Sequence, residues 1–149
     1  LQERFAYVFE PYSVPRPQFW RPCLTARPIE GSFSVGSLEI QSFQQEHGRM
    51  PSLGFRFGPF AYSTDAKSIP EEAFELLQGI DTWIVDSLGD TPHPTHSHLE
   101  QTLDWIERVK PRRAILTHLS HRVDYAELSA RLPAGVEPGF DGMVIDIPE

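Results

Sequence analysis

The sequence has one cysteine, Cys23, and therefore cannot form an internal disulfide bond. A chain without disulfides fits a reducing compartment, and we expect a cytoplasmic protein. A lone cysteine also excludes zinc sites built from several thiolates. The sequence contains no apolar run of about 18 residues, the least that a membrane-spanning helix needs, and no pattern of a secretory signal peptide. We therefore expect no membrane partner.

Positive charge is also scarce, with 13 Lys and Arg residues against 21 Asp and Glu residues and a net charge of −8. An acidic surface argues against broad binding to DNA, RNA or anionic lipid, so nucleic acid is not the expected partner. The sequence has no Walker-type glycine-rich loop and no GxSxG motif. These absences argue against P-loop nucleotide binding and against a serine nucleophile.

What is present suffices for one packed core, because the chain has 149 residues and 40% of them are apolar. No linker-like segment divides the chain, and we expect a single domain. Residues 4–10, 24–30 and 34–43 have the composition of strands, whereas the proline-rich residues 11–22 and the polar residues 44–52 are predicted loops.

From residue 53 onward predicted strands alternate with predicted helices, which indicates an α/β fold with a largely buried sheet. Ser68 and Ser97 are each followed three residues later by Glu, so both are predicted N-caps of helices. The first of these helices should end at Gly79. The predicted strands are 53–57, 60–63, 82–85, 114–116 and 143–147, and a third helix is predicted over 125–132.

Metal-binding and acid–base side chains gather where predicted buried strands end. Asp65, Asp86 and His118 each follow such a strand, and sites in α/β sheets form beyond the carboxyl ends of strands. Imidazole and carboxylate are ligands of zinc and manganese, so His47, Asp65 and His118 are candidate metal ligands. Taken singly, His47 could be a solvated loop residue, Asp65 a turn former and His118 a buried core histidine.

Five of the six histidines lie between His93 and His121. His96 precedes a predicted helix start, where it could donate to a phosphate or protonate a leaving oxygen, or could merely help to cap the helix. His93 is an additional candidate for the same site. His121 and Asp124 could support a ligand or simply lead into the next helix, and Asp141 could orient a ligand or only form a turn.

Several segments together resemble the metallo-β-lactamase superfamily of metallohydrolases. They are YSTDAKSIPEE, DTPHPTHSHLEQTLDWIERVKPRRAILTHLSHRVDY and PGFDGM, with HGRMPSLGFRF upstream. The resemblance covers roughly residues 34–147, and the order and separation of the segments make the combination specific. The most similar group is the bacterial phosphodiesterases that open phosphoribosyl cyclic phosphate, and the tRNA 3′-processing endonucleases are more distant.

The resemblance implies the C-terminal portion of an αββα sandwich that holds two zinc or manganese ions. In that family pattern His47 is a histidine ligand of one metal, Asp65 bridges both metals and His118 is the last ligand, on the second metal. His96 corresponds to the residue that protonates the leaving group. The implied function is a metal-dependent hydrolase, in particular a phosphodiesterase acting on a small cyclic or nucleotide-like phosphoester through a metal-bound hydroxide.

The superfamily's HxHxDH motif does not occur in this sequence. In relatives it lies upstream, so we expect that this chain begins after it and that the isolated chain is inactive and forms a homodimer through its exposed half-core. Two alternatives stay open. One is a thioester or lactone hydrolase of the same superfamily, and the other is a non-catalytic α/β binding module.

Overall fold

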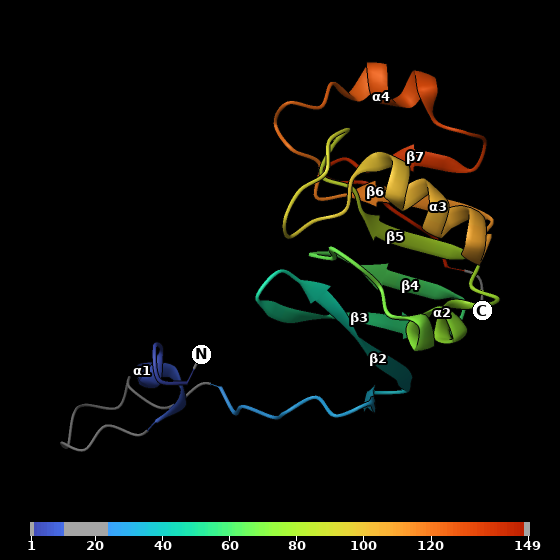
Figure 1. Ribbon diagram of the computed structural model, residues 1–149. Helices are drawn as coiled ribbons and strands as arrows, with labels where there is room; N and C mark the ends of the chain where they lie inside the picture. The colour runs from blue at the N-terminus through green and yellow to red at the C-terminus, as the bar shows by residue number, and fades with distance from the viewer. Residues whose placement is uncertain (1, 11–23, 148–149) are drawn as a thin grey trace. The chain divides into compact units, whose positions relative to one another are not determined.

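The computed structural model describes residues 2–10 and 24–147 of the chain (Figure 1). The chain divides into two compact units, Leu1–Glu30 and Gly31–Glu149, which we describe separately. The prediction of a single domain over residues 1–149 stays a prediction. The predicted proline-rich loop at residues 11–22 lies outside the described residues.

The described residues of the first unit contain a single short helix. The strand predicted over residues 4–10 is wrong, because this segment forms the one-turn helix α1 (Ala6–Phe9). The strand predicted over residues 24–30 is wrong as well, since these residues have no regular structure. A strand needs a neighbour along its length, and between the described segments of this unit a single backbone hydrogen bond forms, from Leu24 N–H to the Val8 carbonyl.

The second unit is built on one seven-stranded sheet whose strands follow one another in sequence order. The first four strands form an antiparallel meander. The fourth to the seventh strand are parallel to one another, so the fourth strand belongs to both parts of the sheet. The strands are β1 (Ser32–Val35), β2 (Leu38–His47), β3 (Met50–Phe57), β4 (Phe60–Ser63), β5 (Thr82–Asp86), β6 (Arg113–Thr117) and β7 (Val136–Pro138).

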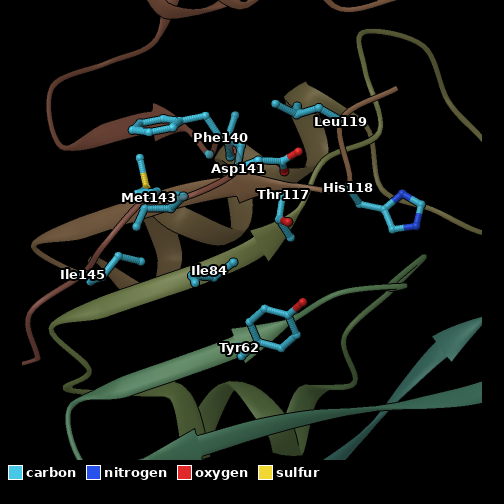
Figure 2. A pocket seen from close by; sticks show the side chains of 12 residues that line it. Tyr62, Ile84, Thr117, His118, Leu119, Phe140, Asp141, Met143 and Ile145 are labelled. Atoms are coloured by element: carbon cyan, nitrogen blue, oxygen red, sulfur yellow. The ribbon is translucent and has the colours of Figure 1, made fainter. Parts of the chain in front are cut away.

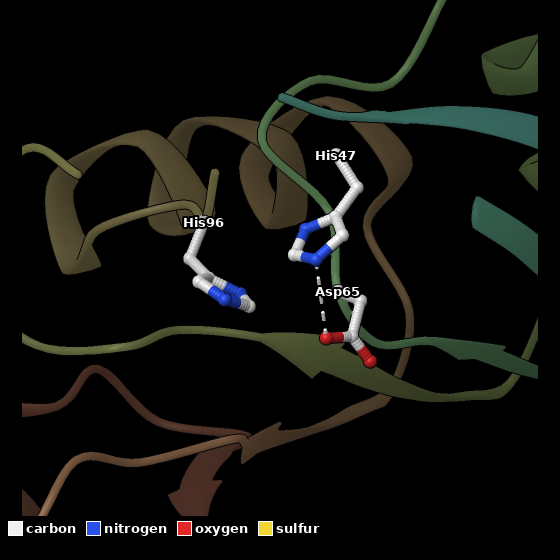
Figure 3. A group of neighbouring side chains, drawn as sticks. All are labelled: His47, Asp65 and His96. Carbon is white, nitrogen blue, oxygen red and sulfur yellow. Dashed lines mark ion pairs between the residues drawn. The ribbon is translucent and has the colours of Figure 1, made fainter. Parts of the chain in front are cut away.

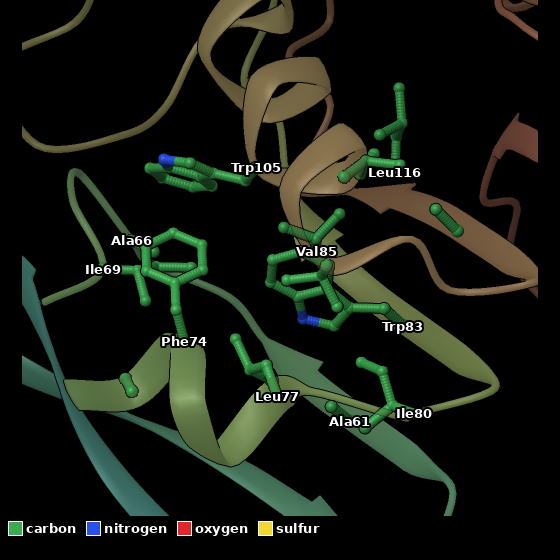
Figure 4. Close-up of a cluster of buried hydrophobic side chains, with 14 of the residues drawn as sticks. Ala61, Ala66, Ile69, Phe74, Leu77, Ile80, Trp83, Val85, Trp105 and Leu116 are labelled. Carbon is green, nitrogen blue, oxygen red and sulfur yellow. The ribbon is translucent and has the colours of Figure 1, made fainter. Parts of the chain in front are cut away.

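The helices α2 (Glu71–Leu77), α3 (Leu99–Val109) and α4 (Tyr125–Arg131) connect the parallel strands. Each contributes to one buried apolar cluster on a single face of the sheet (Figure 4). Trp83 and Val85 of β5 point into this cluster, whereas Ile84 between them points to the opposite face because side chains alternate along a strand. The predicted α/β fold is therefore confirmed, with the predicted helix over residues 125–132 observed as α4.

The polar loop predicted over residues 44–52 is wrong, because β2 and β3 pair through most of this segment and form a tight hairpin. The hydrogen bonds between β2 and β3 satisfy the backbone N–H and C=O groups of this polar stretch. Gln45 is buried there and donates from Nε2 to Ser52 Oγ and to the Thr64 carbonyl, both at 3.1 Å. Gly48, with φ +65°, makes the turn.

Both predicted serine N-caps are wrong, because the two hydroxyls bind more distant partners. Ser68 Oγ donates to the Glu46 carboxylate, and α2 begins after Pro70. Ser97 Oγ donates to the Asp86 carbonyl at 2.7 Å, and α3 begins after His98. The predicted end of the first helix at Gly79 agrees with α2, which ends at Leu77.

The last predicted strand, residues 143–147, is also wrong. The free edge of β6 is taken by β7, so the later segment has no strand to pair with. It keeps the alternation of a strand, and Met143 and Ile145 lie over the face of the sheet that carries Ile84 and Ile115 (Figure 2). None of the described helices has the length and apolar character to cross a bilayer.

Candidate active site

The candidate site lies at the carboxyl-terminal edge of the parallel strands, where four connections converge. His47 ends β2, Asp65 follows β4, and Asp86 ends β5. His96 lies in the loop before α3, and His118 follows β6. Residues separated by up to 71 positions in the sequence therefore meet at one edge of the sheet, as the strand order requires.

The three predicted metal ligands come together around one carboxylate oxygen. Asp65 Oδ1 lies 3.7 Å from His47 Nε2 and 3.4 Å from His118 Nε2 (Figure 3 shows the first pair). A direct charge-assisted hydrogen bond would be shorter, about 2.7–2.9 Å. Two ligand atoms that each lie about 2.1 Å from a tetrahedral zinc ion are about 3.4 Å apart. Asp65 with either histidine thus has the spacing of two ligands of one divalent cation. Among the described residues, the groups whose ligand atoms all lie within 4.8 Å of one another are His47, Asp65 and His96, and Asp86, His96 and His118.

His47 is held in the orientation that a metal ligand needs. Its Nδ1 lies 2.8 Å from the Thr95 carbonyl, which can only accept, so Nδ1 carries the proton. The lone pair is then on Nε2, the atom that faces Asp65. Metal-binding histidines usually have such a second partner on the far ring nitrogen.

The backbone at two of these residues is in the left-handed region, with φ +54° at Asp65 and +61° at His118. This conformation is costly for residues other than glycine and concentrates at functional sites. Asp65 is anchored through its carbonyl, which accepts a 2.7 Å hydrogen bond from Ser52 Oγ. The sheet thus holds both side chains in directions that an ordinary strand end would not provide.

His96 is buried and bonded to a fully buried carboxylate. Its Nδ1 lies 3.1 Å from Asp86 Oδ2, which also accepts the Ala66 N–H at 3.0 Å. The ring of His96 stacks on that of His118 with centroids 4.3 Å apart, and the His47 ring is 4.7 Å away. The proposed acid and the proposed metal ligands therefore share one cluster of rings.

Asp86 was recognised from the sequence as a carboxylate at the end of a buried strand, but sequence reasoning gave it no role in the site. Its position after a buried strand was the available signal. What the sequence did not show is its pairing with a histidine ten residues later, since that pairing depends on how the segment before α3 folds back over β5.

A family profile described as "Beta-lactamase superfamily domain" matches residues 1–119. The chain belongs to the metallo-β-lactamase superfamily. A solved structure of a diphosphatase from the PhnP family is 32% identical, with a TM-score of 0.79 over 83% of this chain and 49% of that one. Within the superfamily the chain is thus close to the PhnP group.

Two further similarities are more distant or cover less of the relative. The short form of human tRNase Z is 23% identical, with a TM-score of 0.61 over 80% of this chain and 48% of that one, and it shares the fold. A protein of Porphyromonas gingivalis (strain ATCC BAA-308 / W83) named octanoyltransferase is 30% identical over all of this chain but only 30% of its own length. The chain spans about half the length of the PhnP-family diphosphatase and of human tRNase Z.

Membership of the metallo-β-lactamase superfamily implies the use of divalent metal. The superfamily pattern agrees with the convergence of His47, Asp65 and His118 seen here. Their assignment as ligands, and that of His96 as the acid, remain hypotheses that the geometry supports.

The remaining predicted residues lie around this cluster. The His93 ring is 5.3 Å from that of His96, and His93 and His121 both line a neighbouring pocket. Asp124 caps α4 by accepting the Glu127 N–H at 2.9 Å, which is one of the two roles left open for it. Asp141 is in a turn and lines a trough of about 450 Å³ that begins at His118 (Figure 2).

Proposed function

We propose that this chain carries part of the active site of a metal-dependent phosphodiesterase that acts on a small cyclic or nucleotide-like phosphoester. The observation that carries the proposal is the pairing of buried His96 with buried Asp86, directly beside the three candidate metal ligands. The 32% identity to a PhnP-family diphosphatase supports the substrate class. The metal, zinc or manganese, and the cytoplasmic location stay predictions.

The chain's own residues would perform two tasks. His47, Asp65 and His118 would hold divalent metal, which when bound polarises phosphoryl oxygens and supplies a water-derived nucleophile. His96 would hold a proton on Nε2 for the leaving oxygen. Because Asp86 accepts from Nδ1, this proton makes the ring a cation whose charge the buried carboxylate offsets.

The direct test is hydrolysis of bis(p-nitrophenyl) phosphate by the complete natural protein with Mn²⁺ or Zn²⁺. His96→Gln should reduce kcat by about 100-fold or more, because a positioned acid contributes that much, while metal content stays that of the wild type. An unchanged kcat would remove the acid role from His96. Loss of bound metal in the same variant would instead assign this histidine to the metal site.

One observation favours acyl chemistry as a second candidate. The trough beside His118 includes Ile84, Ile115 and Met143 in its lining, which could take an acyl chain, and the P. gingivalis relative is named an octanoyltransferase. Thioester hydrolysis can be measured with octanoyl-coenzyme A in the same preparation. A kcat/KM for the thioester well above that for the phosphodiester would replace the first proposal with this one.

A non-catalytic binding module is the remaining alternative for the 149-residue chain itself. Elemental analysis of the purified chain separates the two classes. Near-stoichiometric zinc or manganese would argue against an inert module.

A further inference from the structure

The loop that carries Asp65 is tied to the β2–β3 hairpin by two side chains. Gln45 of β2 donates both hydrogens of its amide group, one to the Thr64 carbonyl and one to Ser52 Oγ, each at 3.1 Å. Ser52 of β3 donates in turn to the Asp65 carbonyl at 2.7 Å. Two residues of one hairpin thus bind the carbonyl groups of two successive residues after β4.

The orientation of the Gln45 amide group follows from its partners. A carbonyl oxygen can only accept, and Ser52 Oγ gives its one hydrogen to Asp65, so both positions require the amide nitrogen. The oxygen Oε1 lies over Gly54, where a Cβ atom would be only 2.7 Å from it. Gln45 is 2% exposed, and buried polar groups are normally hydrogen-bonded. Its two bonds toward the Asp65 loop meet that requirement.

The two carbonyl bonds suit the backbone conformation that Asp65 has. In extended backbone successive carbonyl groups point to opposite sides, so one pair of neighbouring donors would not reach both. In a helical conformation of either hand they point to the same side, and Asp65 has a φ of +54°. The left-handed conformation is unfavourable for aspartate compared with glycine. Hydrogen bonds that require it therefore stabilise the direction in which the carboxylate leaves the backbone.

The same hairpin carries His47, whose Nε2 lies 3.7 Å from Asp65 Oδ1 (Figure 3). Glu46, the residue before it, donates its N–H to the Ser68 carbonyl at 3.0 Å and accepts the Lys67 N–H at 2.6 Å. The hairpin thus holds the loop on both sides of Asp65. The spacing between these two candidate ligands is therefore set by one hairpin and the loop that it binds.

We propose that Gln45 and Ser52 are positioning residues of the metal site. They hold Asp65 in the conformation in which its carboxylate faces His47 and His118, and they thereby strengthen the binding of divalent metal. The proposal rests on the metal site of the proposed function and specifies what determines its affinity. Because Ser52 acts through the Asp65 backbone, its removal leaves the candidate ligands in the chain and changes only how well they are held.

The test compares two serine hydroxyls of the same hairpin in the complete natural protein. Ser52→Ala removes the 2.7 Å bond to the Asp65 carbonyl, whereas Ser42→Ala removes a bond of the same length to the Gly31 carbonyl, away from the candidate ligands. Chelator competition with Mn²⁺ or Zn²⁺ should show about fivefold to tenfold weaker metal binding in Ser52→Ala, as the loss of one hydrogen bond can cause. Ser42→Ala should bind metal like the wild type.

Two further variants test the same chain of hydrogen bonds. Ser52→Thr keeps a hydroxyl and should retain the affinity of the wild type. Gln45→Met keeps the length of the side chain but has no donor, and it should weaken metal binding several-fold. Measurement well below the thermal midpoints of all variants keeps each protein folded, so weaker binding reports on the site.

The outcomes separate this proposal from the proposed function. Equal metal affinity in Ser52→Ala and Ser42→Ala, or a loss in Ser52→Thr as large as in Ser52→Ala, would overturn the positioning role even if the protein hydrolyses bis(p-nitrophenyl) phosphate. Metal binding that depends on Ser52 and Gln45, without hydrolysis of this ester, would sustain the positioning role and overturn the phosphodiesterase.

Discussion

At the scale of single residues, Asp86 is the most connected side chain of the site. Its Oδ2 accepts from the Ala66 amide and from His96, and its Oδ1 accepts from Ser97 Oγ at 3.3 Å. A carboxylate with these contacts both fixes the imidazole ring and supplies a negative charge beside it. The substitution Asp86→Asn separates these two roles. The amide oxygen can replace Oδ2 and still accept from His96, and the amide nitrogen faces the Ser97 hydroxyl, but the negative charge is lost.

We predict that Asp86→Asn lowers kcat of the complete protein by about 10- to 100-fold, because His96 loses the charge that offsets its protonated form. Metal content, measured by mass spectrometry of the purified protein, should not change. Ser97→Ala is the control, since it removes a neighbouring hydroxyl but keeps the carboxylate. An equal loss of kcat in both variants would mean that Asp86 acts only through packing.

A second prediction concerns Asp65. Asp65→Asn should weaken Mn²⁺ or Zn²⁺ binding at least tenfold in the complete protein, because the neutral amide replaces the oxygen that both His47 and His118 face. Competition with a metal chelator measures the change. Asp104→Asn, an exposed aspartate on α3, is the matched control. Equal metal affinity in the two variants would exclude Asp65 as a ligand.

These residues also mark how far sequence reasoning reaches for the site. Asp65 and His118 could be predicted, because residues that end parallel strands share one edge of the sheet. His47 was a candidate ligand from its chemistry but was expected in a loop, and its place at the end of β2 depends on hairpin pairing that the sequence did not show. The bond from Asp86 to His96 depends on tertiary folding and has no signal in the local sequence.

At the scale of elements, the β2–β3 hairpin positions His47 through its contact with the loop before α3. A Cβ atom on Gly48 would lie 2.6 Å from Thr95 Cγ2. That distance is too short, so either the Thr95 methyl group or the hairpin must shift, and both lie next to the Thr95 carbonyl that holds His47. Gly58, in the next turn, has a similar φ of +56° but open space around it.

We therefore predict that Gly48→Ala and Gly58→Ala destabilise the protein to a similar degree through φ, by about 1 kcal/mol. Gly48→Ala should in addition weaken metal binding several-fold, whereas Gly58→Ala should not. Thermal unfolding and metal titration of the two variants provide the comparison. Equal metal affinity in both would show that the hairpin contact does not position His47.

The helices α2 and α3 are joined by an ion pair that makes stability depend on pH. Arg108 donates to both carboxylate oxygens of Glu71 and lies 3.8 Å over the Phe74 ring. These hydrogen bonds hold the pKa of Glu71 below its ordinary value of 4.5. A carboxyl group whose pKa is lowered in the folded state stabilises it above the ordinary value and loses this contribution as the pH falls through the lowered pKa.

We predict that Glu71→Gln lowers the thermal midpoint at pH 7 and that the difference from the wild type shrinks as the pH falls below about 4.5. The effect should be small because the pair is exposed. Glu75→Gln, another exposed glutamate on α2, should show no such pH dependence. A difference that stays constant down to pH 3 would mean that the ion pair contributes nothing.

Elements could be predicted where the apolar pattern matches the burial that the fold imposes. The strand at residues 82–85 and α3 follow this rule, since Trp83 and Val85 of the strand and the apolar residues of α3 face the common core. Residues 44–47 could not be recognised as strand, because Gln45 is a polar residue whose burial depends on partners 7 and 19 positions away. Residues 143–147 alternate like a strand and yet have no edge to pair with.

At the scale of the whole molecule, the two faces of the sheet differ. The face covered by helices is buried, whereas aromatic side chains on the other face are only half-buried. Phe55 lies opposite Tyr62 in the ladder, and the rings of Phe57 and Phe60 stack with centroids 5.1 Å apart. In an αββα sandwich a second sheet packs on this face, and the expected homodimer would be one way to cover it.

The 149-residue chain by itself should therefore associate through this aromatic face. We predict concentration-dependent dimers in sedimentation velocity, because covering half-buried aromatic rings removes apolar surface from water. In the double variant Phe55→Ser with Phe57→Ser, the dissociation constant of the dimer should rise about tenfold or more, which shifts the chain to monomer. Val144→Ser is the control, since Val144 is 82% exposed and belongs to the unpaired segment rather than to this face. A wild-type chain that stays monomeric at high concentration, or a dimer that survives the double variant, would show that this face does not mediate association.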